Sequence, residues 1–260
     1  MRMNKLLLTM LLGVCAGSAQ AQAQATRMLM PEGTYDLFFG AAIGTSWKSR
    51  SEAGARTVVV PALSVQWSNG AFIEVGVHDA TVGVHLSDDP FFDYGALVSM
   101  NRRDQRTDTP GERGGVALQA GGFVSWHPAY NIDLGGELKA GGGFDRGGVL
   151  AHVRALYSMR LAAHHGLNLQ AGLYGADHSW MQGYFGVTPE QSALGGNPAY
   201  RAGAGLVSVY GDLGWNWQVS NKYWLGAGAR LSRLAGPAAA SPLVGNGFRR
   251  SVRVALTYHF

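Results

Sequence analysis

The sequence predicts one all-β domain, an up-and-down antiparallel transmembrane β-barrel of about twelve strands in a bacterial outer membrane. Three observations predict it: apolar and polar residues alternate along most segments after residue 30, glycine is abundant (38 of 260 residues), and short turns alternate with long loops. Only 15% of residues are charged, yet no stretch after residue 25 has the 18 consecutive apolar residues of a membrane helix.

The N-terminus has the pattern of a secretory signal. Positive residues precede an apolar core at 6–16, which is too short to span a bilayer. Overlapping A-x-A cleavage motifs end at Ala21, Ala23 and Ala25, and the sequence does not choose among them. We therefore expect a cleaved signal at 1–25 and a single barrel domain at 26–260.

Charge and cysteine content narrow the function classes. Cys15 is the only cysteine and lies in the expected signal, so we expect no disulfide or thiol chemistry in the mature chain. The net charge is +4, and removing Arg2 and Lys5 leaves 4 − 2 = +2. That is too small to predict a nucleic-acid partner. Phosphate-loop, dinucleotide and metal-spacing motifs are also missing, and we expect no cofactor.

The alternation defines the expected strands. At 251–260 every second residue is apolar, which gives the strand one apolar and one polar face. That segment alone would also suit a soluble β-sandwich, but the same pattern recurs at 35–43, 59–67, 73–77, 82–86, 92–100, 116–126, 132–139, 149–157, 167–174, 207–217 and 223–232. The short pair beside Asp79 could instead be one kinked strand, which would break the even count.

The connections support the same topology. Tight turns follow even-numbered strands at 68–70, 87–90, 127–131, 164–166 and 220–222. Except beside Asp79, longer connections follow odd-numbered strands, at 46–55, 101–114, 141–147, 176–204 and 235–246. This alternation is typical of a closed barrel with short periplasmic turns. Aromatic residues near the short turns predict an interfacial belt: Trp67, Trp126, Tyr157, Trp215, Trp217 and Phe260.

The last strand carries a second signal. Tyr258 and the terminal Phe260 resemble the C-terminal signature by which outer-membrane barrels are recognised for insertion. We expect the barrel-assembly machinery to be a partner during insertion. We also expect this strand to pair with the first one, because an unpaired edge would be an aggregation hazard.

Charged and histidine side chains are expected to line the interior. The alternation points eleven of them inward: Glu74, Asp93, Asp133, Glu137, Lys139, His152, Arg154, Asp212, Arg230, Arg253 and His259. They could form a salt-bridged plug that fills a narrow barrel. The alternative is a small pore whose charges set selectivity.

The longest loop contains a helix signal. Thr188 precedes Pro189, with Gln191 at the third helical position, which predicts a helix that ends near 195–196. The same loop contains Asp177-His178-Ser179, but consecutive residues on a strand point to opposite faces and cannot form a catalytic relay. We therefore expect no enzymatic activity. A membrane-embedded hydrolase stays as the minor alternative, and it should depend on His178.

An arginine-rich loop is expected at the same end of the barrel. It contains Arg102, Arg103, Arg106 and Arg113 together with acidic residues. These arginines could bind lipopolysaccharide phosphates, or they could simply be solvated with the acidic residues around them.

A block in the long loop resembles the MipA/OmpV family of outer-membrane proteins. Its residues are Tyr184, Phe185, Gly186, Val187 and Pro189 at 183–191, with Tyr200 downstream. The resemblance implies an outer-membrane barrel that joins a lytic transglycosylase to a penicillin-binding protein in peptidoglycan remodelling. Other members resemble adhesion, antigen or osmotic-response proteins. For the scaffold role, partners would contact the periplasmic turns at 127–131, 166 and 221.

Overall fold

The computed structural model describes residues 30–47, 55–76, 79–103, 115–142 and 147–260. The expected signal at 1–25, with Cys15, lies outside this range. So do Arg106 and Arg113 of the arginine-rich loop, and the side chains of Arg102 and Arg103.

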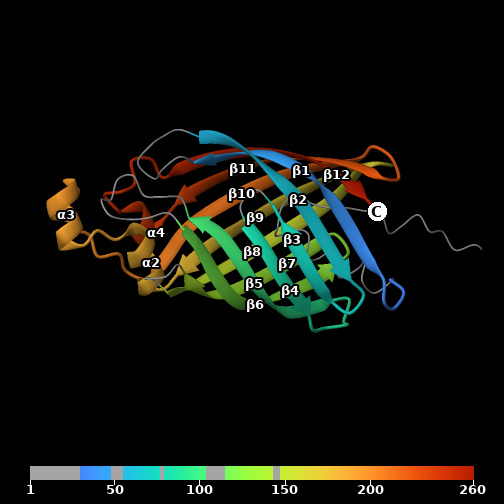
Figure 1. The fold of residues 1–260 in the computed structure, drawn as a ribbon, viewed down its shortest axis with the longest axis horizontal. Helices are drawn as coiled ribbons and strands as arrows, with labels where there is room; N and C mark the ends of the chain where they lie inside the picture. Colours follow the sequence, from blue (N-terminus) through green and yellow to red (C-terminus); the bar gives the residue numbers. More distant parts are fainter. Residues whose placement is uncertain (1–29, 48–54, 77–78, 104–114, 143–146) are drawn as a thin grey trace, which may run out of the picture.

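The described chain forms a closed antiparallel barrel (Figure 1). Its strands are β1 (Tyr35–Trp47), β2 (Ala55–Trp67), β3 (Ala71–Val75), β4 (Asp79–His85), β5 (Phe92–Arg103), β6 (Gly115–Ala129), β7 (Ile132–Gly142), β8 (Gly148–Ala162), β9 (His165–Ala176), β10 (Gly205–Gln218), β11 (Tyr223–Leu234) and β12 (Phe248–His259). The strands pair in sequence order, so the expected twelve-stranded up-and-down topology is confirmed. β3 and β4 are separate antiparallel strands, so the kinked-strand alternative is wrong.

The last strand closes the barrel on the first. β12 pairs with β1 from Phe38↔His259 to Gly44↔Arg253. The backbone N–H of Phe260 also donates to the carbonyl of Leu37 at 3.1 Å. The C-terminal strand therefore has a neighbour on both edges, which removes the aggregation hazard of a free terminal strand.

Most strands present one apolar and one polar face. Val59 and Leu138 point outward and are 69% and 56% exposed, while Asp93 and Asp133 point inward and are buried. Trp126, Tyr157 and Phe260 are exposed near the short-turn end, as the aromatic belt requires. A register shift between Leu206 and Ser208 interrupts the expected alternation along β10. Val207, which was expected to face lipid, is therefore buried under the loops.

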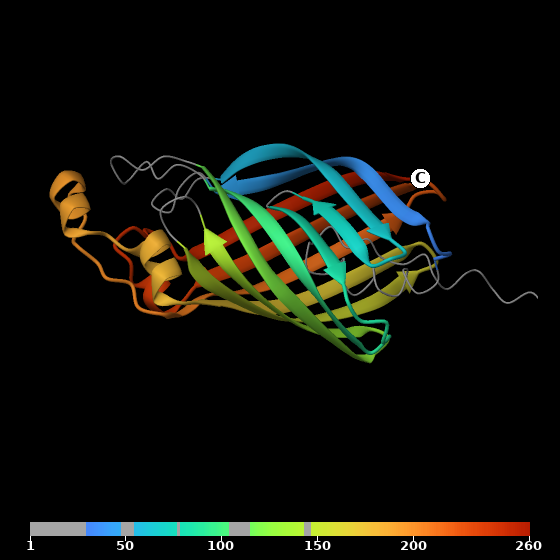
Figure 2. The ribbon, with the colours of Figure 1, turned by 60° about the horizontal axis from the view of Figure 1, so that its bottom comes forward.

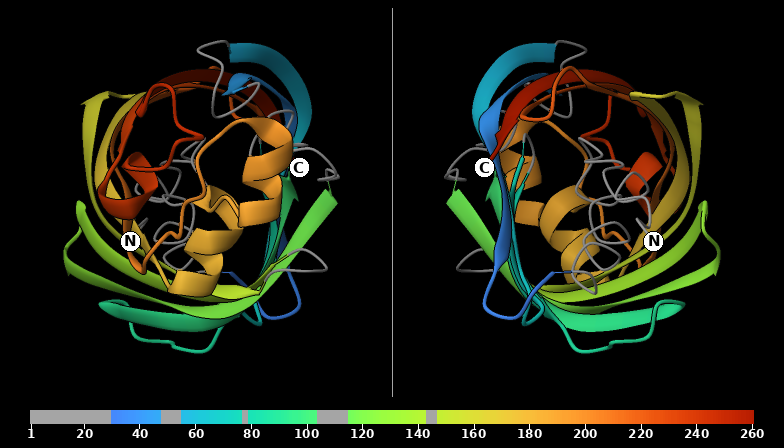
Figure 3. Two further views of the ribbon diagram at one scale, coloured as in Figure 1. Left: turned by 90° about the vertical axis from the view of Figure 1, so that its left-hand side faces the viewer. Right: turned by 90° about the vertical axis from the view of Figure 1, so that its right-hand side faces the viewer.

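The long-loop end carries three short helices, α2 (His178–Phe185), α3 (Pro189–Gly195) and α4 (Gly236–Ala239). Figure 2 shows α2 and α3 beyond the strand ends, opposite the C-terminus, and the end-on views of Figure 3 place α2 across the barrel mouth. Only α3 is predicted from the sequence. Within the described ranges, none of these helices is long and apolar enough to cross a membrane.

Candidate functional site

Ion pairs centred on Asp212 hold the interior wall from β10 to β12. The Asp212 carboxylate accepts from Arg253 Nη2 at 2.6 Å and from Arg230 Nε at 2.8 Å. β10, β11 and β12 are therefore joined by side chains as well as by backbone hydrogen bonds. The Asp212 side chain is only 2% exposed, so this pairing takes place away from bulk water.

A second group of polar side chains continues the wall from β7 to β10. Glu137 lies 2.9 Å from Lys139 and 3.6 Å from His152. The other ring nitrogen of His152 lies 2.8 Å from the Tyr210 hydroxyl, which also accepts from Gln170 at 2.6 Å. Arg230 then lies over the Tyr210 ring, 4.3 Å from its centroid, and joins this group to the Asp212 pairs.

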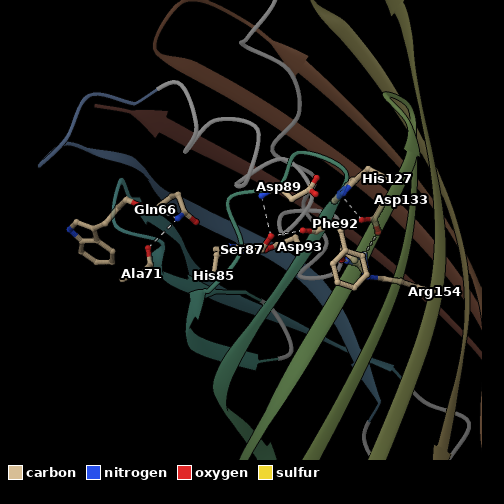
Figure 4. A network of polar contacts seen from close by, with 12 residues as sticks. Gln66, Ala71, His85, Ser87, Asp89, Phe92, Asp93, His127, Asp133 and Arg154 are labelled. Carbon is tan, nitrogen blue, oxygen red and sulfur yellow. Dashed lines mark hydrogen bonds and ion pairs between the residues drawn. The ribbon is translucent and has the colours of Figure 1, made fainter.

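A third group lies nearer the short turns (Figure 4). Asp133 accepts from Arg154 at 2.8 Å and lies 3.0 Å from His127, while Arg154 also donates to Ser125 at 3.2 Å. In the same region His85 and Asp93 are 2.7 Å apart, and both side chains are fully buried. Phe72 and Phe123 pack against the His85 ring, so the charges lie in a packed interior.

The two remaining predicted interior residues lie on β3 and at the β12–β1 closure. Glu74 is half-buried on β3, far along the sheet from the Asp212 pairs. His259 binds Asp36 at 2.5 Å and stacks on Phe38, which places it at the β12–β1 closure. The interior set is therefore divided among several groups, with the densest on β7–β12.

The sequence reasoning missed the neutral partners in these groups. Tyr210 and Gln170 connect His152 to its neighbours, and Ser125 supports Arg154. The signal was available, because the same alternation puts Tyr210 and Gln170 on the inward faces of their strands. A search for charged residues and histidines alone does not find them, because both side chains are neutral.

The family-motif residues build a packed lid at the barrel mouth. Phe185 is buried with Met181 of α2, Val207 of β10 and Leu234 of β11. Its carbonyl accepts from the Ser241 hydroxyl at 2.6 Å. Gly186 follows as the residue that ends α2, and its N–H donates to the Gln182 carbonyl.

The second half of the motif ties the lid to α4. Val187 and Tyr200 form an antiparallel bridge, and the Tyr200 hydroxyl donates to the Pro237 carbonyl at 2.8 Å. Tyr184 stacks on Trp180 of α2 at 4.1 Å. The motif therefore holds α2 and α4 together over β8 and β10.

The predicted helix in this loop forms with its cap. Pro189 is its first residue, and the Thr188 hydroxyl and the Gln191 amide complete a capping box. Gly196 ends the helix with a φ of 73°, a left-handed conformation that suits glycine. The pKa of exposed Glu190 lies below its usual value because its own backbone N–H and the Thr188 hydroxyl stabilise the carboxylate.

In the tripeptide Asp177-His178-Ser179, the first two side chains form hydrogen bonds within the long loop. The Asp177 carboxylate caps α2 by accepting from the backbone N–H of Trp180 at 2.8 Å. The His178 ring lies 2.6 Å from the Ala202 carbonyl, so it ties α2 to the end of the loop. The Asp177 and His178 side chains therefore stabilise the lid and do not bind each other. In the part of the chain that the structure describes, no three His, Cys, Asp or Glu residues are placed to hold a metal ion.

Comparisons with solved structures identify outer-membrane barrels. The NanC porin aligns with a TM-score of 0.50 and 10% identity, covering 84% of this chain and 98% of the porin. An outer-membrane channel from Pseudomonas putida F1 aligns with a TM-score of 0.47 and 10% identity, covering 89% and 97%. The comparison with curated proteins finds no match.

The family comparison covers almost the whole barrel. The model described as MltA-interacting protein MipA matches residues 37–260. This range takes in β1 through β12 and the lid, including the motif residues at 184–200. The chain therefore belongs to the MipA family and is an outer-membrane β-barrel protein.

Proposed function

We propose that this barrel is a non-enzymatic scaffold that binds a murein-cleaving lytic transglycosylase and brings it to a penicillin-binding protein for peptidoglycan remodelling. The observation that carries the proposal is the match over residues 37–260 to a family described as MltA-interacting protein. Periplasmic partners must bind the short-turn side, because the long loops face the cell exterior.

The packing of the interior supports a scaffold over a transport role. Five charged side chains point inward and are at most 7% exposed: Asp93, Asp133, Arg154, Asp212 and Arg253. Buried charges that neutralise each other are typical of a filled barrel, whereas a conducting pore keeps its charges in water.

The short turns offer a specific contact surface. Tyr130, at the β6–β7 turn, is fully exposed, and Phe91, at the β4–β5 turn, is 63% exposed. Asn221 is also exposed, but Gly166 is buried within β9 and offers no contact surface, and His127 turns inward to Asp133. Exposed aromatic residues are typical anchors of protein interfaces. We therefore place the partner site around Tyr130 and Phe91.

Photo-crosslinking in intact cells tests this placement. A photoreactive phenylalanine analogue at Tyr130 should capture a lytic transglycosylase, identified by mass spectrometry. The same analogue at Leu194, an apolar residue of α3 on the opposite side that is 75% exposed, is the matched control. Capture of only lipopolysaccharide and other barrels from Tyr130 would refute the proposed contact site.

A small-solute channel is the second candidate, and the mixed charges of the interior favour it. Glu137, Lys139 and Arg230 are inward-facing and would set selectivity if water reached them. Single-channel recording in a planar bilayer separates the two functions. Steady ion current through the purified barrel would favour the channel, and its absence together with partner capture would favour the scaffold.

A further inference from the structure

Among the described residues, β2 extends beyond the end of its neighbour β3. β2 pairs with β1 along its whole length, from Trp47↔Ala55 to Tyr35↔Trp67. On its other edge it pairs with β3 only from Leu63↔Val75 to Gln66↔Phe72. Among the described residues, the β3-facing edge of β2 therefore has no strand partner from Thr57 to Ala62.

Pro61 explains why the pairing between β2 and β3 ends at Leu63. The N–H of Ser68 donates to the Thr34 carbonyl, and hydrogen-bonded positions alternate along an antiparallel pair. Even-numbered residues of β2 therefore bond to β1, and odd-numbered residues point to β3. The next rung beyond Leu63 would need the N–H of Pro61, which proline lacks. The ladder ends at that position.

The free edge lies within the membrane. Trp67 marks the aromatic belt at the short-turn end of β2, and ten residue steps separate it from Thr57. At about 3.3 Å per residue and a tilt of about 40°, those steps rise ~25 Å, which is about the height of the apolar band. Val59 is 69% exposed on the outward face of this stretch. The edge therefore lies in the outer-leaflet half of the bilayer.

The inward face of the same stretch is apolar and accessible. Val60 pairs with buried Ala42 and so shares its inward face, as do Val58 and Ala62 two residues to either side. These three side chains are partly exposed, whereas Asp93 and Ser99 on the interior of β5 are completely buried. A partly exposed, apolar inner surface thus lies beside the free edge.

We propose that this edge of β2 is a lateral opening, in which the alkyl chain of an outer-leaflet lipid reaches the inner surface formed by Val58, Val60 and Ala62. The surface is continuous with the lipid-facing side of β2, so hydrocarbon already lies against its rim. Apolar contact with these side chains favours the alkyl chain over water.

The backbone of the edge suits this occupant better than a pairing strand. Proline on a sheet edge blocks the addition of another strand, because one rung of the new ladder has no donor. It also reduces the number of N–H groups that lipid would leave unsatisfied, since only Thr57 and Val59 keep a donor on this edge. A second copy of the chain, paired edge to edge, is therefore disfavoured.

Fluorescence quenching by labelled lipid tests the proposal. Bimane is attached to a single cysteine replacing Val60, in a Cys15→Ser background, and the barrel is placed in phosphatidylcholine vesicles that contain a lipid with a nitroxide on its acyl chain. We expect quenching comparable to that of a label at outward-facing Val59. It should exceed, severalfold, the quenching at Ser232, an inward-facing and partly exposed position on β11.

A second variant separates chain entry from mere proximity. Ala62→Trp fills the inner surface, so it should reduce quenching at Val60 severalfold and leave quenching at Val59 unchanged. Heat-modifiable migration in detergent gels confirms that each variant is folded. Quenching at Val60 as weak as at Ser232 would overturn the proposal. Disulfide-linked dimers of a Pro61→Cys variant in the membrane would also overturn it, because they would show that a second copy covers the edge.

Discussion

Two walls of this barrel are built from the same strand pattern but are stabilised differently. From β7 to β12 the strands pair along most of their length, as in β9–β10 from Gly205↔Ala176 to Trp217↔His165. Inward-facing charged side chains add further links across these strands. From β2 to β4 the ladders are short, and the inner surface of β2 is apolar.

The difference shows that one wall of a barrel can be cross-linked by side chains while a strand elsewhere in the same barrel is only partly paired. Ion pairs between inward-facing side chains stabilise the β7–β12 wall. The packed lid stabilises it further, because α2 contacts β8 and α4 contacts β10. On the other side, the inner surface of β2 at Val58, Val60 and Ala62 is apolar. Among the described residues, the β3-facing edge of β2 has no strand partner from Thr57 to Ala62. Four predictions test this contrast, beginning with the change of largest expected effect.

Replacing Asp212 by asparagine should destabilise the barrel most. It leaves the Arg230 and Arg253 guanidinium groups facing a neutral amide, and breaking a buried pair costs about 3–5 kcal/mol. Urea unfolding in phospholipid vesicles, followed by tryptophan fluorescence, measures the loss. Glu74→Gln on β3 is the matched control and should cost less. Equal losses would mean that the two walls do not differ.

Tyr210→Phe should lower the free energy of unfolding by less than the Asp212 substitution does. The hydroxyl meets His152 at 2.8 Å and Gln170 at 2.6 Å, and its removal leaves both without that partner in a buried site. We expect a loss of about 1–3 kcal/mol in the same unfolding assay. Tyr157→Phe, on the exposed outer face of β8, should change stability little. A neutral Tyr210→Phe would show that the polar group does not stabilise the wall.

The sequence predicts the walls better than it predicts their contacts. A period of two fixes which side chains share a face, so the inward position of Asp212 follows from the pattern. Its partner Arg253 is 41 residues away, and only the register of β10, β11 and β12 brings the two together. A one-residue register change would alter every such pair.

The sequence does not predict α2 or the burial of Val207, because both depend on tertiary packing. The local signal of α2 is the Asp177 N-cap alone, without a capping box, and burial of Met181 and Phe185 under the loops stabilises the helix further. Val207 left the expected pattern because of a local register shift. Pro61 could have been recognised, since proline inside an expected strand indicates an edge.

Thr188→Ala tests whether the outer helix of the lid contributes to the β7–β12 wall. It removes the capping hydrogen bond to Gln191, which should cost α3 about 1 kcal/mol. α3 has no buried residues, so the unfolding midpoint of the barrel should stay unchanged. Hydrogen exchange at 190–195 should become faster. A lower barrel midpoint would show that α3 stabilises the wall.

Amide exchange along β2 measures the most local effect and does not change the stability of the barrel. The N–H of Val59 points to the unpaired edge, whereas those of Val58 and Val60 donate toward β1 under the alternation. In lipid-free detergent, Val59 should exchange about tenfold or more faster than both neighbours, a ratio that corresponds to ~1.4 kcal/mol of protection. Leu213 of β10, with strands on both sides, should show no such contrast with its neighbours. Slow exchange at Val59 would mean that another group covers the edge, and the β2 side would then be as closed as the β7–β12 wall.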